Sequence, residues 1–552
     1  MLQSVSPKND LPLDADPEAK PRQGLFSPFA VTAFRIIWIA NLFANLGTWA
    51  QSVAAAWVVT EAHASPLLVA MIQVASALPL VLLSILSGVL ADNHDRRKIM
   101  LAGLCFEMSG AIFLSTIAFL GILDPILLII SILWISIGGA VTIPAWQAAV
   151  SEQVPGEMLG NAVLLNSVNY NVARAAGPAL GGLMLSAVGP AWVFLFNCLC
   201  YLALIWAIWR WRRELPVRTL PPEGLLQGVV AALRFTQYSS VTRLVMLRSF
   251  SFGISASAVW ALLPLLAHRN PEGDAAVYGY MLGALGAGAI GGSLLVNRGR
   301  LLIGTSRLIS LAGLVFGLVM LVLGTLDSLW AIFPALLTGG ICWIAAVASY
   351  NSAVQILVPD WVKARALALY QTAIYGGLAL GSYLWGHLAE SMGVKGALFS
   401  AGVLMIACAF LLYPRRLPEL DASSIAHADS PQPGQPGFAF NPDRGSVLVT
   451  IEYRIPQERT RDFVRASRPL RRLRLRNGAD RWALYRDAGD PELWQETMVV
   501  ENWLQHLRML DRLTIADKAI IDNLTMLHEG DGPPRVRHGV SYESGSYEPI
   551  QS

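Results

Sequence analysis

The chain has 552 residues, of which 54% are hydrophobic and only 14% are charged, and its formal net charge is +3. A charged fraction so far below the ~25% of soluble domains excludes a soluble enzyme over most of the chain, and the small net charge gives no indication of nucleic-acid binding. The five cysteines lie inside apolar runs at spacings that match no zinc-binding template, so neither a metal nor a cofactor is expected.

Residues 1–31 are polar and rich in proline, which predicts a disordered tail that stays in the cytosol. Two charge-free runs follow, Ile36 to Val59 and Leu67 to Ala91. Each is long enough to cross a hydrocarbon core of ~30 Å, and each must be helical because backbone groups cannot stay unpaired in lipid. Twelve transmembrane helices are predicted in this way, near residues 34–60, 67–91, 98–121, 125–148, 160–187, 190–210, 243–267, 276–297, 305–325, 328–350, 365–388 and 393–413.

The turns between these helices differ in charge. Alternate turns carry most of the basic residues, at 96–98, 210–218, 298–300, 363–365 and 415–416. The turns between them hold few, such as His268, Arg269 and Lys395. The positive-inside rule therefore puts both termini in the cytosol, which requires an even number of spans. The expected location is a bacterial inner membrane, crossed many times.

The two halves of the helical region look duplicated at a constant offset of 204 residues. The offset relates Gly88 to Gly292, Arg96 to Arg300, Gly177 to Gly381 and Gly182 to Gly386. Chance is a poor explanation for one offset that holds across separate regions. Two six-helix halves joined by a basic loop are typical of a transporter built from repeats.

The composition becomes that of a soluble protein near the C-terminus. Residues 415–445 are rich in Pro, Asp, Ser and Gly, which indicates a linker. Strand patterns follow at 447–455, 481–486, 493–500 and 536–542, and helical patterns at 456–476 and 503–527. Their order, βαββαβ, predicts a ferredoxin-like α+β domain.

The predicted fold is an all-α polytopic membrane protein with a cytosolic ferredoxin-like domain at its C-terminus. The predicted segments are a tail (1–31), an N-terminal six-helix half (32–213), a cytosolic loop (214–242), a C-terminal six-helix half (243–414), a linker (415–445) and the α+β domain (446–543).

Two motifs in the first half point to a known family. The loop after the second span reads Gly88-Val-Leu90-Ala-Asp92-Asn-His-Asp95-Arg96-Arg97-Lys98, and the fifth span contains Gly177-Pro178-Ala-Leu-Gly181-Gly182. They resemble the Gly-x-Leu-Ala-Asp…Arg-Arg loop and the Gly-Pro-x-x-Gly-Gly exporter motif of the major facilitator superfamily. Three further segments are similar in sequence to the branch of this superfamily that contains the enterobactin exporter and macrolide-efflux-like secretion proteins. They are Trp57-Val-Val-Thr60, Ile143-Pro144-Ala-Trp146-Gln147 and residues 165–174. The resemblance covers about residues 25–416.

The resemblance implies a gate at the cytosolic mouth, formed by Gly88, Leu90, Asp92, Arg96 and Arg97. Gly88 would let two helices approach closely, and Asp92 at a helix end can meet an arginine or a facing helix N-terminus. Such a charge lock would hold the outward-facing state. Asn93 and Asp95 stand where Arg and Gly are usual in the family. The alternative is that the basic cluster only sets the topology.

The exporter motif combines small residues with a proline. Gly177 and Gly181 are spaced i, i+4, which lets helices pack backbone to backbone, and Pro178 permits a bend. A tight helix contact and a hinge that favours export are compatible interpretations of Gly177, Pro178, Gly181 and Gly182. Ser382 stands at the position of Pro178 in the second half, so the bend is specific to the first half.

Polar residues inside the spans are candidates for a substrate cavity, namely Asn41, Asn45, Thr48, Ser52, Gln147 and Asn171. The first four share one helix face, which would line the cavity or form hydrogen bonds between helices. Glu107 and Arg174 are charges at membrane depth, each costing ~2.5–3.5 kcal/mol. A pair between them or a water-filled cavity would offset this cost, and a carboxyl in low dielectric is suited to carry a proton. Both a structural ion pair and proton coupling stay open.

The function that these features predict is secondary active export of an amphipathic small molecule, siderophore or drug-like, by proton antiport. Its partners would be the substrate, the lipid bilayer and protons. No Gly-x-x-x-x-Gly-Lys-Ser/Thr loop is present to indicate an ATP-driven pump. The alternative is a transporter fused to an enzyme or a ligand-sensing unit, because the C-terminal pattern is similar to small dimeric α+β-barrel domains, some of which are monooxygenases. A pocket there would use Trp482, Trp494, Asn502, Trp503 and His506, and the domain is a candidate for self-association.

Overall fold

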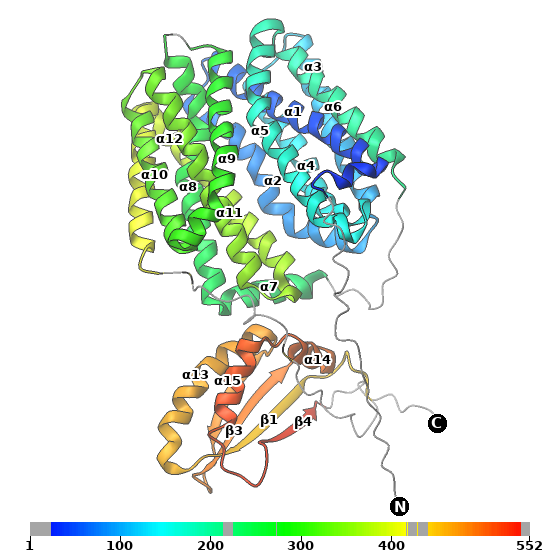
Figure 1. Ribbon diagram of the computed structural model, residues 1–552, viewed down its shortest axis with the longest axis vertical. Coiled ribbons are helices and arrows are strands. Elements are labelled where there is room, and N and C mark those ends of the chain that lie inside the picture. The colour runs from blue at the N-terminus through cyan, green and yellow to red at the C-terminus, as the bar shows by residue number, and fades with distance from the viewer. Residues whose placement is uncertain are drawn as a thin grey trace, which may run out of the picture.

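The computed structural model describes residues 24–212, 225–271, 273–415, 417, 428 and 440–541. A bundle of long helices makes up most of the molecule, and a small α+β unit lies at one end of it (Figure 1). The beginning of the predicted tail, the first part of the predicted loop 214–242 and most of the predicted linker 415–445 lie outside the described residues.

The first half of the bundle consists of α1 (Thr32–Glu61), α2 (Pro66–Asn93), α3 (Arg96–Phe119), α4 (Pro125–Gln153), α5 (Leu159–Val188) and α6 (Pro190–Arg210). Short polar residues cap three of these helices at the N-terminus, where the first N–H groups have no partner within the helix. Ser65, Asp95 and Asp124 each accept a hydrogen bond from a backbone N–H of the first turn. The caps therefore divide the apolar sequence into separate helices.

The second half consists of α8 (Ser240–Arg269), α9 (Ala275–Ile303), α10 (Thr305–Thr325), α11 (Leu329–Leu357) and α12 (Asp360–Leu412). α12 is two helices joined at Gly393, whose φ is 76°. Gly189, between α5 and α6, has a φ of 83°. Both angles are in the region that favours glycine. Glycine therefore makes the corresponding sharp connection in each half.

Nine helices are long and apolar enough to cross a membrane within the described part of the chain, namely α2, α3, α4, α6, α8, α9, α10, α11 and α12. α1 and α5 are also 30 residues long. They carry the polar side chains that the sequence assigned to a cavity, and this lowers their hydropathy.

Two segments before and between the halves differ from the predictions. Residues 27–30 of the predicted tail form a short helix, η1 (Ser27–Ala30), and the Phe29 ring packs on Trp38 with 5.0 Å between centroids. The predicted loop 214–242 contains the helix α7 (Leu225–Tyr238), which buries Ala232 and Phe235. The loop that the sequence predicts between the halves therefore contains a helix, whose short apolar face is covered by tertiary contacts.

The C-terminal unit contains β1 (Val447–Arg454), η4 (Gln457–Arg459), α13 (Thr460–Asn477), β2 (Arg481–Arg486), β3 (Leu493–Val500), α14 (Trp503–Asp511), α15 (Ile515–Thr525) and β4 (Arg535–Val540). The strands form one antiparallel sheet in the order β2-β3-β1-β4. Alternate residues of β1 are buried, so one sheet face packs against the core. All four predicted strands are present.

The predicted single helix over 503–527 was wrong. The segment forms α14 and α15, because Thr514 and Asp517 form a capping box that starts a new helix. The core beneath the sheet also holds a buried ion pair, in which the Arg474 Nε donates to a Glu496 oxygen at 2.9 Å. Tyr453 and Trp482 donate to the same carboxylate at 3.1 and 3.0 Å, so the buried charge is fully hydrogen-bonded.

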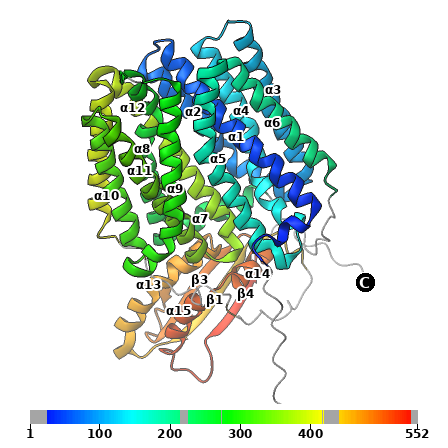
Figure 2. The same cartoon turned by 45° about the horizontal axis from the view of Figure 1, so that its top comes forward.

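The α+β unit docks on α7 and the start of α12 (Figure 2). Arg234 of α7 forms an ion pair with Asp480 at 2.8 Å. The Arg512 guanidinium lies 4.3 Å from the ring centroid of Trp361, the second residue of α12. Phe235 contacts Trp361 edge to face, so the docking site combines charge and aromatic contacts.

Candidate functional site

Two of the four candidate cavity residues on α1 make contacts between helices. The Asn45 amide donates to the Asn169 Oδ1 of α5 at 3.1 Å. Thr48 lies 3.3 Å from the Tyr201 hydroxyl of α6. Ser52 donates to a carbonyl of its own helix at 2.8 Å. For Asn45 the structure therefore favours the interhelical alternative, whereas Thr48 is exposed and Asn41 is half-buried.

The other two cavity candidates lie on α4 and α5. Gln147 is exposed on α4, and Asn171 is half-buried on α5, where its amide donates to the Ser167 carbonyl at 2.8 Å. Sequence reasoning did not single out Asn169, which is fully buried and donates to the Trp38 carbonyl at 2.8 Å. Its spacing from Asn166, within the quoted 165–174 segment, could have drawn attention to it.

Glu107 is buried between α3 and α4, with 8% of its surface exposed. The Thr142 hydroxyl donates to Glu107 Oε1 at 2.9 Å, and Tyr201 of α6 is its second side-chain partner. Gly138 makes room for the acid, because a Cβ there would lie 2.5 Å from the Glu107 Cγ. The carboxyl group is therefore enclosed by polar groups of the first half alone.

Arg174 lies in the middle of α5 and contacts the opposite half of the bundle. Its guanidinium carbon is 5.6 Å from the ring centroid of Trp343 of α11, and only 9% of the residue is exposed. Tyr170 and Tyr375, of α5 and α12, are the titratable groups that act on it electrostatically. Among the described residues no carboxylate and no hydrogen-bond acceptor pairs with the guanidinium. Arg174 is thus a cation held between the two halves by aromatic rings.

The structure does not bring Glu107 and Arg174 together, so the ion pair that the sequence allowed is not formed among the described contacts. Each charge instead has its own surroundings. A cation–π contact contributes ~0.5–2 kcal/mol, whereas a central arginine costs ~2.5–3.5 kcal/mol or more. The Trp343 contact alone therefore leaves Arg174 without full compensation.

The exporter motif lies where helices touch. A Cβ at Gly177 would be 2.6 Å from the Trp49 Cβ, and a Cβ at Gly181 would be 2.5 Å from the Ala50 Cα, both on α1. A Cβ at Gly182 would be 2.5 Å from the Ala275 carbonyl oxygen of α9. Real Cβ atoms are not found at such distances, so glycine is required for α5 to contact α1 and α9.

The candidate gate residues tie together the first half. Arg96 of α3 donates to Glu152 Oε1 of α4 at 2.8 Å and to the Ala148 carbonyl at 3.0 Å. Arg97 donates to the Ile208 carbonyl at 3.1 Å and to the Trp209 carbonyl near the end of α6. These contacts fix helix ends at one mouth of the bundle.

Two further gate residues have fewer contacts. A Cβ at Gly88 would meet no atom within 4 Å, so the close helix approach expected there is absent from this conformation. Leu90 is 39% exposed. The side chain of Asp92 lies outside the described part of the structure, and the predicted charge lock stays a prediction.

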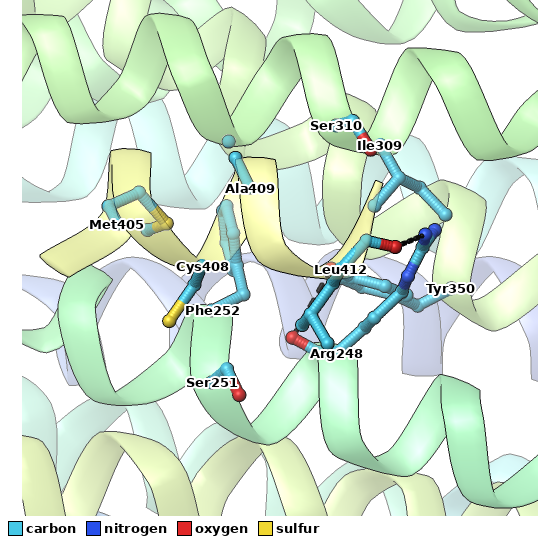
Figure 3. Close-up of a pocket in the computed structure, with 11 residues that line it drawn as sticks. Arg248, Ser251, Phe252, Ile309, Ser310, Tyr350, Met405, Cys408, Ala409 and Leu412 are labelled. Atoms are coloured by element: carbon cyan, nitrogen blue, oxygen red, sulfur yellow. Dashed lines mark hydrogen bonds between the residues drawn. The ribbon is translucent and has the colours of Figure 1, made fainter. Parts of the chain in front are cut away.

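A small cavity of about 30 Å³ lies beside Arg248 between α8, α10, α11 and α12 (Figure 3). This volume has room for little more than a water molecule, and it is far smaller than the ~300 Å³ of a ligand pocket. Arg248 is 3% exposed and donates to the Leu412 and Arg415 carbonyls at 2.5 and 2.8 Å. Arg248 is therefore a buried cap for the end of α12.

In the α+β unit, two histidine side chains contact each other beside the sheet. His506 of α14 and His538 of β4 have ring centroids 4.9 Å apart, beside Trp503. Burial and the neighbouring His538 lower the pKa of His506 to about 4. Trp482 and Trp494 pack elsewhere in the core, against Glu496 and Phe463. The five predicted pocket residues are thus not gathered in one place, and the described residues include no group of three metal-ligating side chains.

Known proteins resemble the chain over its whole helical region. A family model described as transmembrane secretion effector matches residues 23–546. The multidrug efflux pump Tap of Mycolicibacterium fortuitum is 24% identical over 404 residues, covering 70% of this chain and 97% of that protein. The enterobactin exporter EntS of Shigella flexneri is 28% identical over 340 residues, covering 59% of this chain and 77% of that protein.

A solved structure shares the fold. The crystal structure of a bacterial homologue of the human lysosomal transporter Spinster, inward-facing and unoccupied, aligns with a TM-score of 0.56 at 14% identity, covering 70% of this chain and 97% of that one. The matched share is about that of the helical bundle, whereas the family model also extends over the α+β unit. This chain belongs to the transmembrane secretion effector family of the major facilitator superfamily, whose members are multi-pass membrane transporters.

Proposed function

We propose that this protein exports an amphipathic small molecule, siderophore or drug-like, from the cytosol by alternating access. The observation that carries the proposal is the motif Gly177 to Gly182 at the close crossing of α5 with α1 and α9. Similarity to an efflux pump and to a siderophore exporter supports the direction of transport. Since relatives with these different substrates match similarly, the substrate class needs evidence from the site itself.

The proposed topology has twelve spans. α1 and α5 join the nine apolar helices, and α12 contributes one span on each side of Gly393. With an even number of spans and basic turns on one side, both termini and the α+β unit would lie in the cytosol, beneath a bacterial inner membrane.

The contacts between the halves support an inward-facing state. Gly182 meets Ala275 and Gly279 of α9, and Gly386 of α12 meets Leu67 and Ala70 of α2. These residues lie in the parts of their helices away from α7 and the α+β unit. In the proposed topology this is the outer side, so the pathway would be closed outside and would receive substrate from the cytosol.

Proton antiport is proposed to use Glu107. The acid is buried in the first half, with Thr142 and Tyr201 as hydrogen-bond partners that can serve both its charged and its neutral form. Protonation and release at this position would alter contacts among α3, α4 and α6. Proton uptake and release would then take place within the first half, and the resulting helix movements would couple them to export of the substrate.

The α+β unit is proposed to be a ferredoxin-like module that senses a ligand or pairs with a second copy. Its strand order β2-β3-β1-β4 supports the ferredoxin-like assignment. Its docking on Trp361 supports a regulatory role, because that residue begins α12, which packs against the first half. An enzyme remains the second candidate, favoured by the adjacent His506 and His538, and haem or flavin absorbance of the purified protein would distinguish it.

Transport assays test the main proposal. Cells with and without the chain are loaded with fluorescent drugs and, separately, assayed for siderophore secretion, each with and without a protonophore. We expect lower drug accumulation or higher secretion only with the chain, and loss of the difference with the protonophore. Equal accumulation and secretion in both cell types, with the protein present in the membrane, would reject export of these classes.

A further inference from the structure

Arg174 is the feature that the proposed transport cycle leaves unexplained. It is nine-tenths buried at the middle of the bundle, and among the described residues Trp343 is the ring that its guanidinium faces. Trp343 itself packs against Trp260, with 4.3 Å between ring centroids, so the ring under the guanidinium is part of an aromatic cluster. A buried cation with unused donors requires an anion or ordered water.

The surroundings of Arg174 suit a ligand better than a structural partner. Tyr170 lies one turn before Arg174 on α5, and Tyr375 comes from α12. Phenol groups can donate hydrogen bonds to an anion but do not neutralise a cation. Arg174 and Tyr170 belong to the first half, whereas Trp343 and Tyr375 belong to the second. α5 packs against α9 across the interface between the halves (Figure 1). The molecule therefore presents donors around an uncompensated positive charge where the halves meet.

We propose that the exported substrate is an acid, and that its carboxylate binds Arg174 between Tyr170 and Tyr375 while its apolar part lies along the aromatic residues of α8 and α11. This inference rests on the proposed export function and narrows its substrate class to amphipathic carboxylates. The guanidinium supplies paired N–H donors in the fork geometry that carboxylates accept. A neutral analogue would leave Arg174 unpaired and would bind more weakly.

The position also explains how an acid would drive the cycle. Because Arg174 belongs to the first half and Trp343 and Tyr375 to the second, a carboxylate bound among them joins both halves. Without the anion, the contact of the Arg174 guanidinium with Trp343 adds only a cation–π interaction to the packing of α5 on α9, where a Cβ at Gly286 would lie 2.6 Å from the Ala175 Cα. The substrate itself would thus complete the contact that permits the halves to close around it.

The test compares two probes that differ in charge only. Dansylglycine carries a carboxylate, and dansylglycinamide is its neutral amide. Efflux of each probe is measured from loaded cells, and melting temperatures of the purified full-length protein are measured with each probe. The variants are Arg174→Gln, Arg174→Lys and, as the control for loss of a positive charge, Arg35→Gln. Arg35 is exposed, and its guanidinium has one hydrogen bond to the residues that the structure describes, to the Phe29 carbonyl at 3.4 Å.

We expect at least tenfold faster efflux of the acid than of the amide, and at least a tenfold loss of acid efflux in Arg174→Gln. Arg174→Lys should lie between, because an ammonium keeps the charge but loses the fork. Arg35→Gln should match the unchanged protein. The acid should raise the melting temperature of the unchanged protein but not that of Arg174→Gln, whose own melting curve reports whether it is folded.

The remaining outcomes separate this inference from the proposed function. Export of the amide or of fluorescent drugs without export of the acid would overturn the inference and leave export standing. Stabilisation by the acid that depends on Arg174, without any efflux, would support the site and overturn export. Neither stabilisation nor efflux with the acid would overturn the inference, as would acid efflux that is unaffected in a folded Arg174→Gln.

Discussion

The two halves of the bundle share a scaffold and differ in their chemistry. α4 (Pro125–Gln153) and α11 (Leu329–Leu357) have the same length and correspond residue for residue at the offset of 204. The corresponding glycines Gly189 and Gly393 have φ of 83° and 76°. Arg96 contacts Ala148, and its counterpart Arg300 contacts the counterpart of Ala148, Ser352, at 2.7 Å. The repeat is therefore present in the packing as well as in the sequence.

The charged and aromatic candidates break this repeat. Leu378 stands in the second half where the first has Arg174, and Leu311 stands where the first has Glu107. Conversely, Trp343 corresponds to Gly139 in the first half. Repeated positions thus form helix contacts and turns, whereas the candidate binding and coupling groups occur once. In the proposed transport cycle, a symmetric frame with asymmetric contents would permit the halves to rock while substrate and proton bind to different groups.

The shared scaffold predicts that glycines at corresponding crossings are equally necessary. Gly181→Leu should reduce export to background while the protein remains inserted, since a Cβ would already lie 2.5 Å from the Ala50 Cα. Gly381→Leu, at the counterpart of Gly177 in the same motif, should do the same, because a Cβ there would lie 2.2 Å from the Ile254 carbonyl oxygen. Gly139→Leu is the matched control, with no atom within 4 Å of its Cβ position. Normal drug efflux by Gly181→Leu in intact cells would show that the crossing tolerates separation.

Glu107 occurs only in the first half, and its replacement is predicted to impair proton coupling without impairing folding or binding. Glu107→Gln should reduce pH-driven export about tenfold or more, and it should leave membrane abundance and probe binding close to normal, because an amide can keep the bond with Thr142. Thr142→Val is the control that removes the partner and keeps the acid. Transport into proteoliposomes with and without a pH gradient measures the effect. Unchanged gradient dependence in Glu107→Gln would assign the acid a packing role.

Arg96 and Arg300 provide a comparison of the same position with different partners. Arg96 pairs with the charged Glu152, whereas Arg300 donates to Ser349 and Ser352. Arg96→Gln leaves a carboxylate that is mostly buried, so we expect a several-fold fall in folded protein, against about twofold for Arg300→Gln. Arg96→Gln with Glu152→Gln should recover part of the loss. The abundance of folded protein is measured by size-exclusion chromatography of a fluorescent fusion. An equal fall in abundance in both single variants would contradict the predicted difference.

The long helices could be predicted from sequence because each is a long apolar run with few charges, bounded by turn residues. The sequence analysis did not predict α7, because its apolar segment is short and directly follows Pro221 and Pro222, which are typical of a loop. The break before α15 was visible as the capping pair Thr514 and Asp517, although the apolar periodicity across it suggested one helix.

The candidate site could be predicted only in part. Arg174 was identifiable as a charge at membrane depth, but its contact Trp343 lies 169 positions away and no local pattern connects them. The sequence therefore allowed a pair with Glu107, which the arrangement of helices separates. Long-range partners depend on how the halves face each other, and a single sequence carries no signal for that.

The smallest expected effect concerns a contact that only the second half makes. Trp361 holds Arg512 of the α+β unit, while the corresponding residue in the first half is Glu157. Trp361→Ala should weaken docking by ~1 kcal/mol, the scale of a partly exposed cation–π contact, which is a few-fold change in the docking equilibrium. Trp361→Phe should retain most of it, and Trp330→Ala is a control because Trp330 is 91% exposed at the other end of α11.

Hydrogen exchange of the α13 amides in the full-length protein measures docking, since α13 contacts α7. Faster exchange with unchanged efflux would restrict the unit to an accessory role, whereas altered efflux would show that the α+β unit acts on transport through the second half. Exchange in Trp361→Ala as slow as in the unchanged protein would contradict the role of this contact in docking.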